Sequence, residues 1–376
     1  MLSIERCEIY ITNVCNLNCP NCVTFNNFAF RGHQRWNDYK QIYESWSKRL
    51  HINTIGILGG EPFVHPDLMP WLENILELWP NSNIELLSNG TELHRYPEVR
   101  SLLEKHKNRL LLTISAHGVQ QKQKICNDLM SWLGNNATVT HKPNHSEITN
   151  WLNSYQQIKD QLWPECKTPE DFLELPLQIQ DECSEIFGLS YNHWINNLYV
   201  SEVSNDLGII VPVSLKNQFW TSAVIYDDNT GRMSLHNSNI KAAYAVCCGR
   251  DRELEIMVHH LNRGNLYKCS TVALLPEMLN QFQFDISAED LELVNKYKHC
   301  KVTATDEELE NFVLELKKDK PIAQCKFCQA TGDYNSKFEA GTKKIKFYNT
   351  VRSSAEEFWS SKPAVGSSNL SGPAKN

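Results

Sequence analysis

The first third of the chain alternates short apolar strands with amphipathic helices. Strands are predicted at residues 8–14, 53–58, 84–87, 110–115 and 137–141, and helices at residues 36–50, 67–78, 97–106 and 120–133. Strands that alternate with helices form βαβ units, which have a parallel sheet and right-handed crossovers. The pattern therefore predicts an α/β fold. In such folds, ligands bind at the carboxyl ends of the strands.

This alternation is lost beyond residue 150. Residues 150–207 are rich in Trp, Gln and Glu and mostly helical in pattern. Residues 208–214 predict a sixth strand, and residues 223–235 predict a hairpin with a polar turn. The end of the chain, residues 353–376, is rich in Ser, Pro, Gly and Ala, which predicts a disordered tail.

Composition and charge exclude several classes of protein. The 376 residues carry a formal net charge of −7 with scattered Lys and Arg, so general nucleic-acid binding is not expected. The N-terminus lacks the pattern of a signal peptide, and no apolar stretch approaches the roughly 20 residues of a membrane span. We therefore expect a cytoplasmic protein. Clustered cysteines in such a compartment more often bind metal than form disulfides.

Three of the 13 cysteines follow the first predicted strand in a CxxxCxxC spacing, as Cys15, Cys19 and Cys22. Three thiolates this close together suit three corners of a cubane iron–sulfur cluster. A structural zinc site usually adds a fourth Cys or His, and the nearest candidate, His33, is not at zinc-finger spacing. Three ligands would leave one iron open to chelate a substrate. A zinc site or a cysteine-rich loop is the alternative.

Polar and glycine residues follow the next strands. The second strand ends in Gly59, Gly60, Glu61 and Pro62, and the third and fourth strands are followed by Ser88, Asn89, Ser115 and His117. A strand-end carboxylate can accept a hydrogen bond from an ammonium group, and glycines let the backbone approach a ligand closely. Each of the later four residues has an alternative role as a turn residue or a helix cap.

Together, the cysteine triad and the Gly-Gly-Glu-Pro segment resemble the radical SAM superfamily. The resemblance implies a partial (β/α)6 TIM-like barrel with a 4Fe–4S cluster on Cys15, Cys19 and Cys22, whose open iron binds S-adenosyl-L-methionine (SAM). An electron from a flavodoxin- or ferredoxin-type donor then cleaves SAM to a 5′-deoxyadenosyl radical, which abstracts a hydrogen atom from a substrate. The resemblance assigns SAM binding to the strand-end residues Gly59, Gly60, Glu61, Pro62, Ser88, Asn89, Ser115 and His117.

One position departs from this resemblance. Many members of the family carry an aromatic residue immediately before the third cysteine, packed near the adenine, whereas this chain has Asn21. Phe25 and Phe28 are the nearest aromatic replacements.

A second group of cysteines lies between residues 247 and 328. The segment from Gly264 to Cys269 resembles the hairpin of a twitch or SPASM-type extension, and a CxxC pair follows at Cys325 and Cys328. The resemblance implies a second, auxiliary 4Fe–4S cluster on Cys248, Cys269, Cys325 and Cys328. Because a full SPASM domain has more clustered cysteines, the single-cluster twitch form is preferred.

The cysteine ligands of the second cluster have alternatives. Cys247 adjoins Cys248, and only one of the two can easily point at a given cluster, while Cys300 is a possible replacement ligand. A zinc site is the alternative to a cluster.

The implied domains are a barrel over residues 1–215 with a helical insertion at about 150–207, and a small α+β auxiliary-cluster domain over 216–335.

The reaction class is named by the resemblance, and the substrate is not. We expect an oxidoreductase or epimerase that acts on a small polar metabolite such as a carbohydrate, because no peptide-recognition domain precedes the first strand. A peptide-modifying maturase or epimerase and a non-catalytic zinc-binding interaction module are the alternatives. An epimerase would need a hydrogen donor, for which Cys126, Cys183 and Cys300 are candidates. Candidate pocket residues are His193, Trp194, Trp220 and His236.

Overall fold

The computed structural model describes residues 2–143 except 20, 21, 29, 118 and 135, residues 199–215, residues 223–251 except 228, 229, 246 and 248, and residues 256–330. Seven strands lie in the first two stretches: β1 (Leu2–Thr12), β2 (Leu50–Gly59), β3 (Asn83–Ser88), β4 (Leu110–Ala116), β5 (Thr138–Pro143), β6 (Tyr199–Ser204) and β7 (Ile210–Leu215). The strands β12 (His259–Asn262), β13 (Asn265–Tyr267) and β15 (Cys300–Lys301) join them in one sheet.

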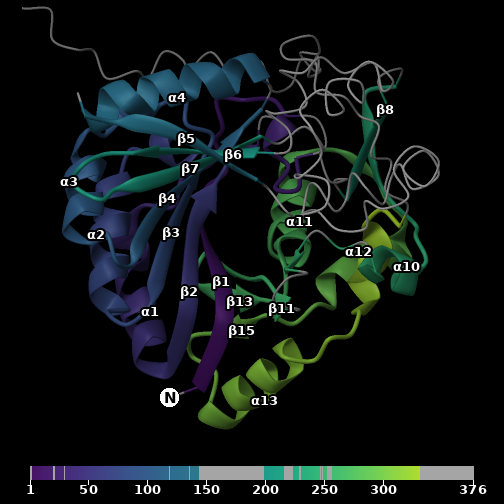
Figure 1. Ribbon diagram of the computed structural model, residues 1–376. Helices are drawn as coiled ribbons and strands as arrows, with labels where there is room; N and C mark the ends of the chain where they lie inside the picture. The colour runs from purple at the N-terminus through teal and green to yellow at the C-terminus, as the bar shows by residue number, and fades with distance from the viewer. Residues whose placement is uncertain are drawn as a thin grey trace, which may run out of the picture.

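The order of that sheet is β15-β13-β12-β1-β2-β3-β4-β7-β6-β5 (Figure 1). All neighbouring pairs from β12 through β1, β2, β3 and β4 to β7 are parallel. A large, mainly parallel sheet in an α/β chain confirms the predicted fold class and is consistent with a partial TIM-like barrel.

Two strand predictions need correction. The predicted fifth strand forms β5, but it lies at the sheet edge against antiparallel β6, while β7 takes the place beside β4. Residues 199–204, predicted within a helical insertion, form β6 instead. Local patterning predicts that a segment forms a strand, but not which strand pairs with it. A short turn at residues 205–209 joins β6 and β7 as an antiparallel hairpin. Residues 150–198 of the predicted insertion, and the predicted tail, lie outside the described residues.

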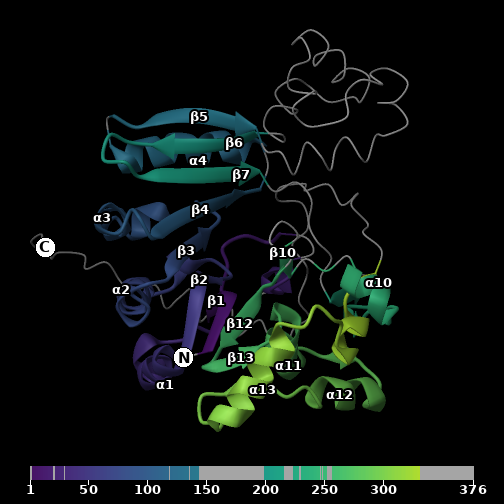
Figure 2. The ribbon, with the colours of Figure 1, turned by 60° about the horizontal axis from the view of Figure 1, so that its bottom comes forward.

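The helices of the first half are α1 (Trp36–Arg49), α2 (Leu68–Leu78), α3 (Glu98–Lys105) and α4 (Val119–Leu133). They cover one face of the sheet, as Figures 1 and 2 show. Alternate strand residues such as Ile9, Ile57 and Leu112 are fully buried in this core together with Trp46 and Trp71. A strand presents every second side chain to one face, so the residues between them belong to the other face.

The C-terminal part contains α10 (Ile240–Ala245), α11 (Ser270–Gln281), α12 (Ala288–Asn295), α13 (Asp306–Leu316) and a short 3-10 helix η4 (Ala323–Phe327). Its small strands are β8 (Val224–Asp227), β9 (Arg232–Leu235), β10 (Arg250–Asp251), β11 (Ile256–Met257) and β14 (Phe284–Asp285). The strands β8 and β9 form the hairpin that the sequence predicted. Because β12 pairs with β1, the barrel sheet continues into this part of the chain, across the predicted domain limit at residue 215.

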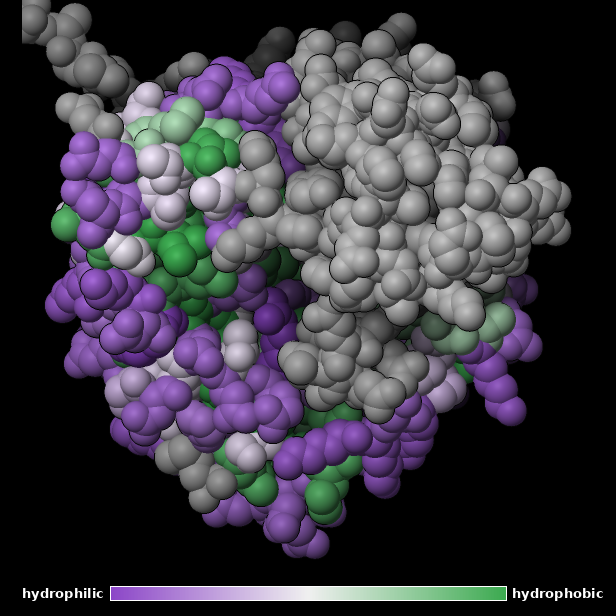
Figure 3. Space-filling model, viewed as in Figure 1, coloured by the Kyte–Doolittle hydropathy of each residue, from purple (hydrophilic) through white to green (hydrophobic). Residues whose placement is uncertain are grey.

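The face of the sheet turned away from α1–α4 has an apolar and a polar region. Figure 3 shows hydrophobic side chains gathered over β3, β4 and β7. Leu111 on β4 and Ile210 on β7 are 40% and 49% exposed. The polar region contains Arg6, Glu8 and Glu85, from β1 and β3. No helix within the described stretches is both long and apolar enough to cross a bilayer.

A buried histidine closes the turn after β2 and gives a test of this region. The fully buried His65 accepts a hydrogen bond at Nδ1 from the Asp67 backbone N–H (2.8 Å) and donates from Nε2 to the Gln34 carbonyl (2.9 Å). Only the neutral imidazole can make both bonds. Burial accordingly lowers the pKa of His65 to about 4.

Since unfolded histidine titrates near pH 6.5, this stabilisation is present above pH 6.5 and is lost as the pH falls toward 4. Between pH 7 and 5, wild-type protein should lose about 2 kcal/mol more unfolding free energy than His65→Gln. Urea unfolding at the two pH values measures the difference. The exposed His94 supplies the control, because His94→Gln should keep the wild-type dependence. Equal losses in all three proteins would contradict the assignment.

Candidate functional site

The first cysteine group lies on the loop between β1 and α1, at the carboxyl edge of the sheet. Cys15, Cys19 and Cys22 are half-buried there. Burial raises the pKa of Cys15 well above its usual value and that of Cys19 to about 12, and the charges of the other cysteines act in the same direction. The three thiols therefore lie within direct electrostatic reach of one another.

The donor set of this group consists of three thiols on one loop. A cubane spreads its protein ligands over separate irons, and three thiolates are the ligands such a cluster uses. The residues present therefore fit a 4Fe–4S cluster with one iron left for another ligand.

Hydrogen bonds tie the third cysteine to β1. The Cys22 Sγ lies 3.3 Å from the Thr24 Oγ1, which donates to the Asn26 Oδ1 at 2.6 Å. The fully buried Tyr10 on β1 also donates its hydroxyl to the Asn26 Oδ1, at 3.2 Å. The position of Cys22 is thus fixed by a side chain that belongs to the barrel.

Asn89 connects the first cysteine to the end of β3. Its Nδ2 donates to the Asn16 Oδ1 at 2.8 Å and lies 4.0 Å from the Cys15 Sγ. Its Oδ1 accepts from the Thr91 backbone N–H and hydroxyl at 3.0 and 2.6 Å. The predicted site residue Asn89 therefore lies directly against the cysteine loop.

Glu61 lies buried at the carboxyl edge of the sheet, between the ends of β2 and β3. It has no exposed surface, and its carboxylate accepts hydrogen bonds from the Phe63 N–H (3.0 Å), the Ser88 hydroxyl (2.8 Å) and the Asn89 N–H (2.7 Å). Burial raises the pKa of Glu61 to about 7, while the three hydrogen bonds oppose that rise. A carboxylate has about four acceptor positions, and these hydrogen bonds use three of them. Pro62 begins the 3-10 helix η2 (Pro62–Val64) that holds Phe63 in place.

The two glycines before Glu61 make room for the cysteine loop. The Gly60 N–H donates to the Thr12 carbonyl at 2.7 Å, and the Glu61 N–H donates to the Val14 carbonyl at 2.9 Å. A Cβ on Gly59 would lie 2.3 Å from the Thr12 oxygen, and one on Gly60 would lie 2.2 Å from the Val14 oxygen. Both glycines thus make room for the backbone that leads into Cys15, and their approach to a ligand stays a prediction.

Ser115 and His117 lie at the end of β4. Ser115 is half-buried and pairs in register with Ser214 of β7. The His117 backbone N–H donates to the Gln121 Oε1 at 2.9 Å, at the start of α4. Their contact with SAM stays a prediction.

The aromatic candidates are already packed in a core. Phe25 and Phe28 are buried with Tyr10 and Phe30 in a cluster that includes residues of β8, β9 and α11. Phe25 has φ of +64°, an unusual conformation for a residue with a side chain. Asn21 lies outside the described residues.

The second cysteine group lines one cavity. Cys247, Cys269, Cys325 and Cys328 all face it, from the end of α10, the N-cap of α11 and the two ends of the CxxC turn. Burial raises the pKa of Cys328 to about 12 and that of Cys269 well above its usual value, and neighbouring cysteines add to both shifts. Cys248, the ligand chosen from the sequence, lies outside the described residues, whereas Cys247 lies beside the other three.

The cavity adjoins the first site. Val23, the residue after Cys22, is part of its lining. The Thr271 Oγ1 lies 3.6 Å from the Cys328 Sγ, and the Cys328 N–H donates to the Cys325 carbonyl at 3.1 Å. Four thiols around one cavity fit a fully ligated cluster. The sequence could not show that the two cysteine groups share a neighbour.

Other predicted residues lie elsewhere. Cys300 is buried in the main core at β15, as is Cys126 on α4. His236 is half-buried after β9. Outside the described residues lie Cys183, His193, Trp194 and Trp220.

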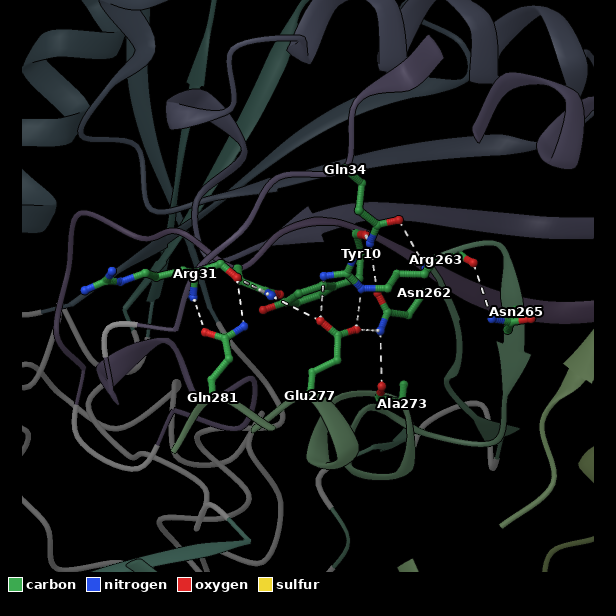
Figure 4. Close-up of polar contacts among 10 residues, drawn as sticks. Tyr10, Arg31, Gln34, Asn262, Arg263, Asn265, Ala273, Glu277 and Gln281 are labelled. Carbon is green, nitrogen blue, oxygen red and sulfur yellow. Dashed lines mark hydrogen bonds and ion pairs between the residues drawn. The ribbon is translucent and has the colours of Figure 1, made fainter. Parts of the chain in front are cut away.

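A polar network that sequence reasoning missed links α11 and the end of β12 to the segment between β1 and α1 (Figure 4). Glu277 on α11 accepts from the Arg263 Nε and the Asn262 Nδ2, both at 2.8 Å. Asn262 in turn accepts from the Gln34 Nε2 at 2.8 Å, and Asn13 donates to Glu277 at 3.4 Å. The helix that begins after Cys269 is thereby held against the loop that carries Cys15, Cys19 and Cys22.

Comparison with known proteins matches the same region. Residues 9–132 match the family model of the radical SAM superfamily. The matched stretch, which carries the first cysteine group, is similar to that superfamily. Its curated relatives include GTP 3′,8-cyclases from Nautilia profundicola, 26% identical over 95 residues, and Alkaliphilus metalliredigens, 30% identical over 99 residues. These matches cover 25% and 26% of this chain and only 30% and 31% of the relatives.

Proposed function

We propose that this protein is a radical SAM enzyme that cleaves SAM on a cluster held by Cys15, Cys19 and Cys22. One observation carries the proposal: three thiols and the buried Glu61 meet at the carboxyl ends of β1 and β2, within a matched radical SAM region. With cluster and SAM bound, the site would supply a 5′-deoxyadenosyl radical. The electron would come from a flavodoxin- or ferredoxin-type protein.

The protein's own part is to hold and orient these groups. The three cysteines would ligate the cluster, and the remaining acceptor position of Glu61 would bind the ammonium of SAM. Ser88 and Asn89 hold the Glu61 carboxylate, and Asn89 also positions the loop at Cys15. Gly59, Gly60 and Pro62 shape the strand end, and we assign Ser115 and His117 to the far side of the SAM pocket.

The polar face of the sheet supports a small polar substrate. The Glu8 Oε2 lies 3.1 Å from the His260 Nε2, and Thr113 donates to Glu85 at 2.9 Å. Such an array of donors and acceptors suits hydroxyl groups. We therefore propose a small polar metabolite such as a carbohydrate, and the GTP named for the relatives is a second polar candidate.

The experiment that tests this proposal follows the abstracted hydrogen. Anaerobically reconstituted protein is incubated with reductant, SAM and deuterated sugars, nucleotides or peptides, and 5′-deoxyadenosine is analysed by mass spectrometry. Deuterium in 5′-deoxyadenosine identifies the substrate, and transfer from a peptide alone would overturn the small-molecule proposal. Zinc without iron and sulfide in the purified protein would contradict the radical mechanism.

The four-thiol cavity supports a second, auxiliary cluster, and we propose Cys247 with Cys269, Cys325 and Cys328 as its ligands. Adjacent residues rarely face one site together, so Cys247 and Cys248 make a matched pair. Cys247→Ala should lose about one cluster of iron and sulfide, whereas Cys248→Ala should keep the wild-type content. Iron, sulfide and visible absorbance measure the difference. Loss of iron and sulfide in Cys248→Ala alone would favour Cys248 as the ligand. If neither variant loses iron and sulfide, neither cysteine ligates the cluster.

A further inference from the structure

A buried lysine lies at the wall of the four-thiol cavity. Lys268 directly precedes Cys269, is 5% exposed and is part of the cavity lining. Lysine is almost never fully buried unless its charge is compensated. The position of this ammonium therefore calls for a functional explanation.

Two backbone carbonyls hold the Lys268 ammonium in place. Its Nζ donates to the carbonyls of Lys318 (3.2 Å) and Lys320 (3.0 Å), just beyond α13. An ammonium has three N–H groups, and the third has no partner among the residues that the structure describes. Carbonyls hold the ammonium without carrying a negative charge that would neutralise it.

The backbone of Lys268 is fixed as well. Its N–H donates to the Tyr297 hydroxyl at 2.8 Å, and its carbonyl lies 3.1 Å from the His259 Nδ1. The side chain consequently cannot swing away by a local backbone shift. Lys268 lines the same cavity as Cys269 and Cys325. Burial lowers the pKa of Lys268, and the neighbouring Cys269, Cys325 and Glu315 oppose that shift.

We infer that Lys268 is a tuning residue that raises the reduction potential of the auxiliary cluster in this cavity. The inference rests on the proposed second cluster. One-electron reduction adds a negative charge to the cluster, and a fixed positive charge in a poorly solvated wall stabilises the reduced form. Net charge and hydrogen bonds to sulfur are the factors by which proteins set such potentials.

The experiment isolates the second cluster in the full chain. In a parent protein with Cys15, Cys19 and Cys22 replaced by alanine, the remaining cluster is titrated with dithionite and followed by electron paramagnetic resonance. Adding Lys268→Met should lower the ratio of reduced to oxidised cluster at a fixed potential at least tenfold, which is about 59 mV for one electron. Lys268→Arg should keep the parent potential, and so should Lys318→Met, which removes an exposed charge from the same segment.

The outcomes separate the two claims. A cluster whose potential is unchanged by Lys268→Met overturns the role of Lys268 and leaves the second cluster standing. A parent protein without residual iron and sulfide overturns the second cluster, and with it the tuning role. If Lys268→Met fails to retain iron, Lys268→Gln, which keeps donors for the two carbonyls, carries the same test, with the same tenfold change expected.

Discussion

Replacing Cys15, Cys19 and Cys22 together with alanine should reduce the formation of 5′-deoxyadenosine from SAM to the level of a protein-free control. Each thiol would supply one corner of the cluster, so the triple variant would lack all three of its protein ligands. The variant should also lose about one cluster of iron. Liquid chromatography of anaerobic, dithionite-reduced reactions measures the product.

A control thiol separates ligation from general damage. Cys126 is buried in the main core on α4, away from both cysteine groups, so Cys126→Ala should keep the wild-type rate. Circular dichroism and thermal unfolding should show that the triple variant remains folded, because the three side chains lie on a loop and outside the main core. Cleavage of SAM at the wild-type rate by the folded triple variant would refute the proposed function.

Glu61→Gln should both destabilise the protein and weaken SAM binding. All three hydrogen bonds of the carboxylate come from donors, Phe63, Ser88 and Asn89, and the amide of Gln brings an NH2 group into the same buried space. At least one donor must then face another donor. A buried group left unsatisfied costs about 1–3 kcal/mol, and more next to a lost charge. We therefore expect a loss of about 3 kcal/mol in unfolding free energy.

The effect on SAM comes from the remaining acceptor position. Loss of a charge-assisted bond to the SAM ammonium should weaken its affinity at least about tenfold, equivalent to 1.4 kcal/mol. Urea unfolding and equilibrium binding of SAM measure the two losses separately. Glu77 on the exposed face of α2 gives the matched control, because Glu77→Gln should change neither by a measurable amount. A stable Glu61→Gln protein with wild-type SAM affinity would remove Glu61 from the site.

The sequence by itself determined the fold class and supplied the prediction for the chemistry of the first site. Alternating strand and helix patterns are local, so β1, β2, β3 and β4 could be read with their helices. The spacing of Cys15, Cys19 and Cys22 is also local, since a short loop brings thiols together whatever the rest of the chain does. The Gly-Gly-Glu-Pro segment could be recognised for the same reason. The sequence did not show that its two glycines pack against the backbone of Thr12 and Val14.

Only the tertiary structure decided which distant segments became neighbours. The pairing of β12 with β1, and the position of β7 beside β4, depend on hydrogen bonds between residues far apart in the chain. The same long-range packing placed Cys247 with the later cysteines and Lys268 at their cavity. A periodic pattern specifies which face of a strand is buried, but not which strand lies beside it. The chain's own cysteine spacing therefore defined one site, and folding of the whole sheet assembled the other.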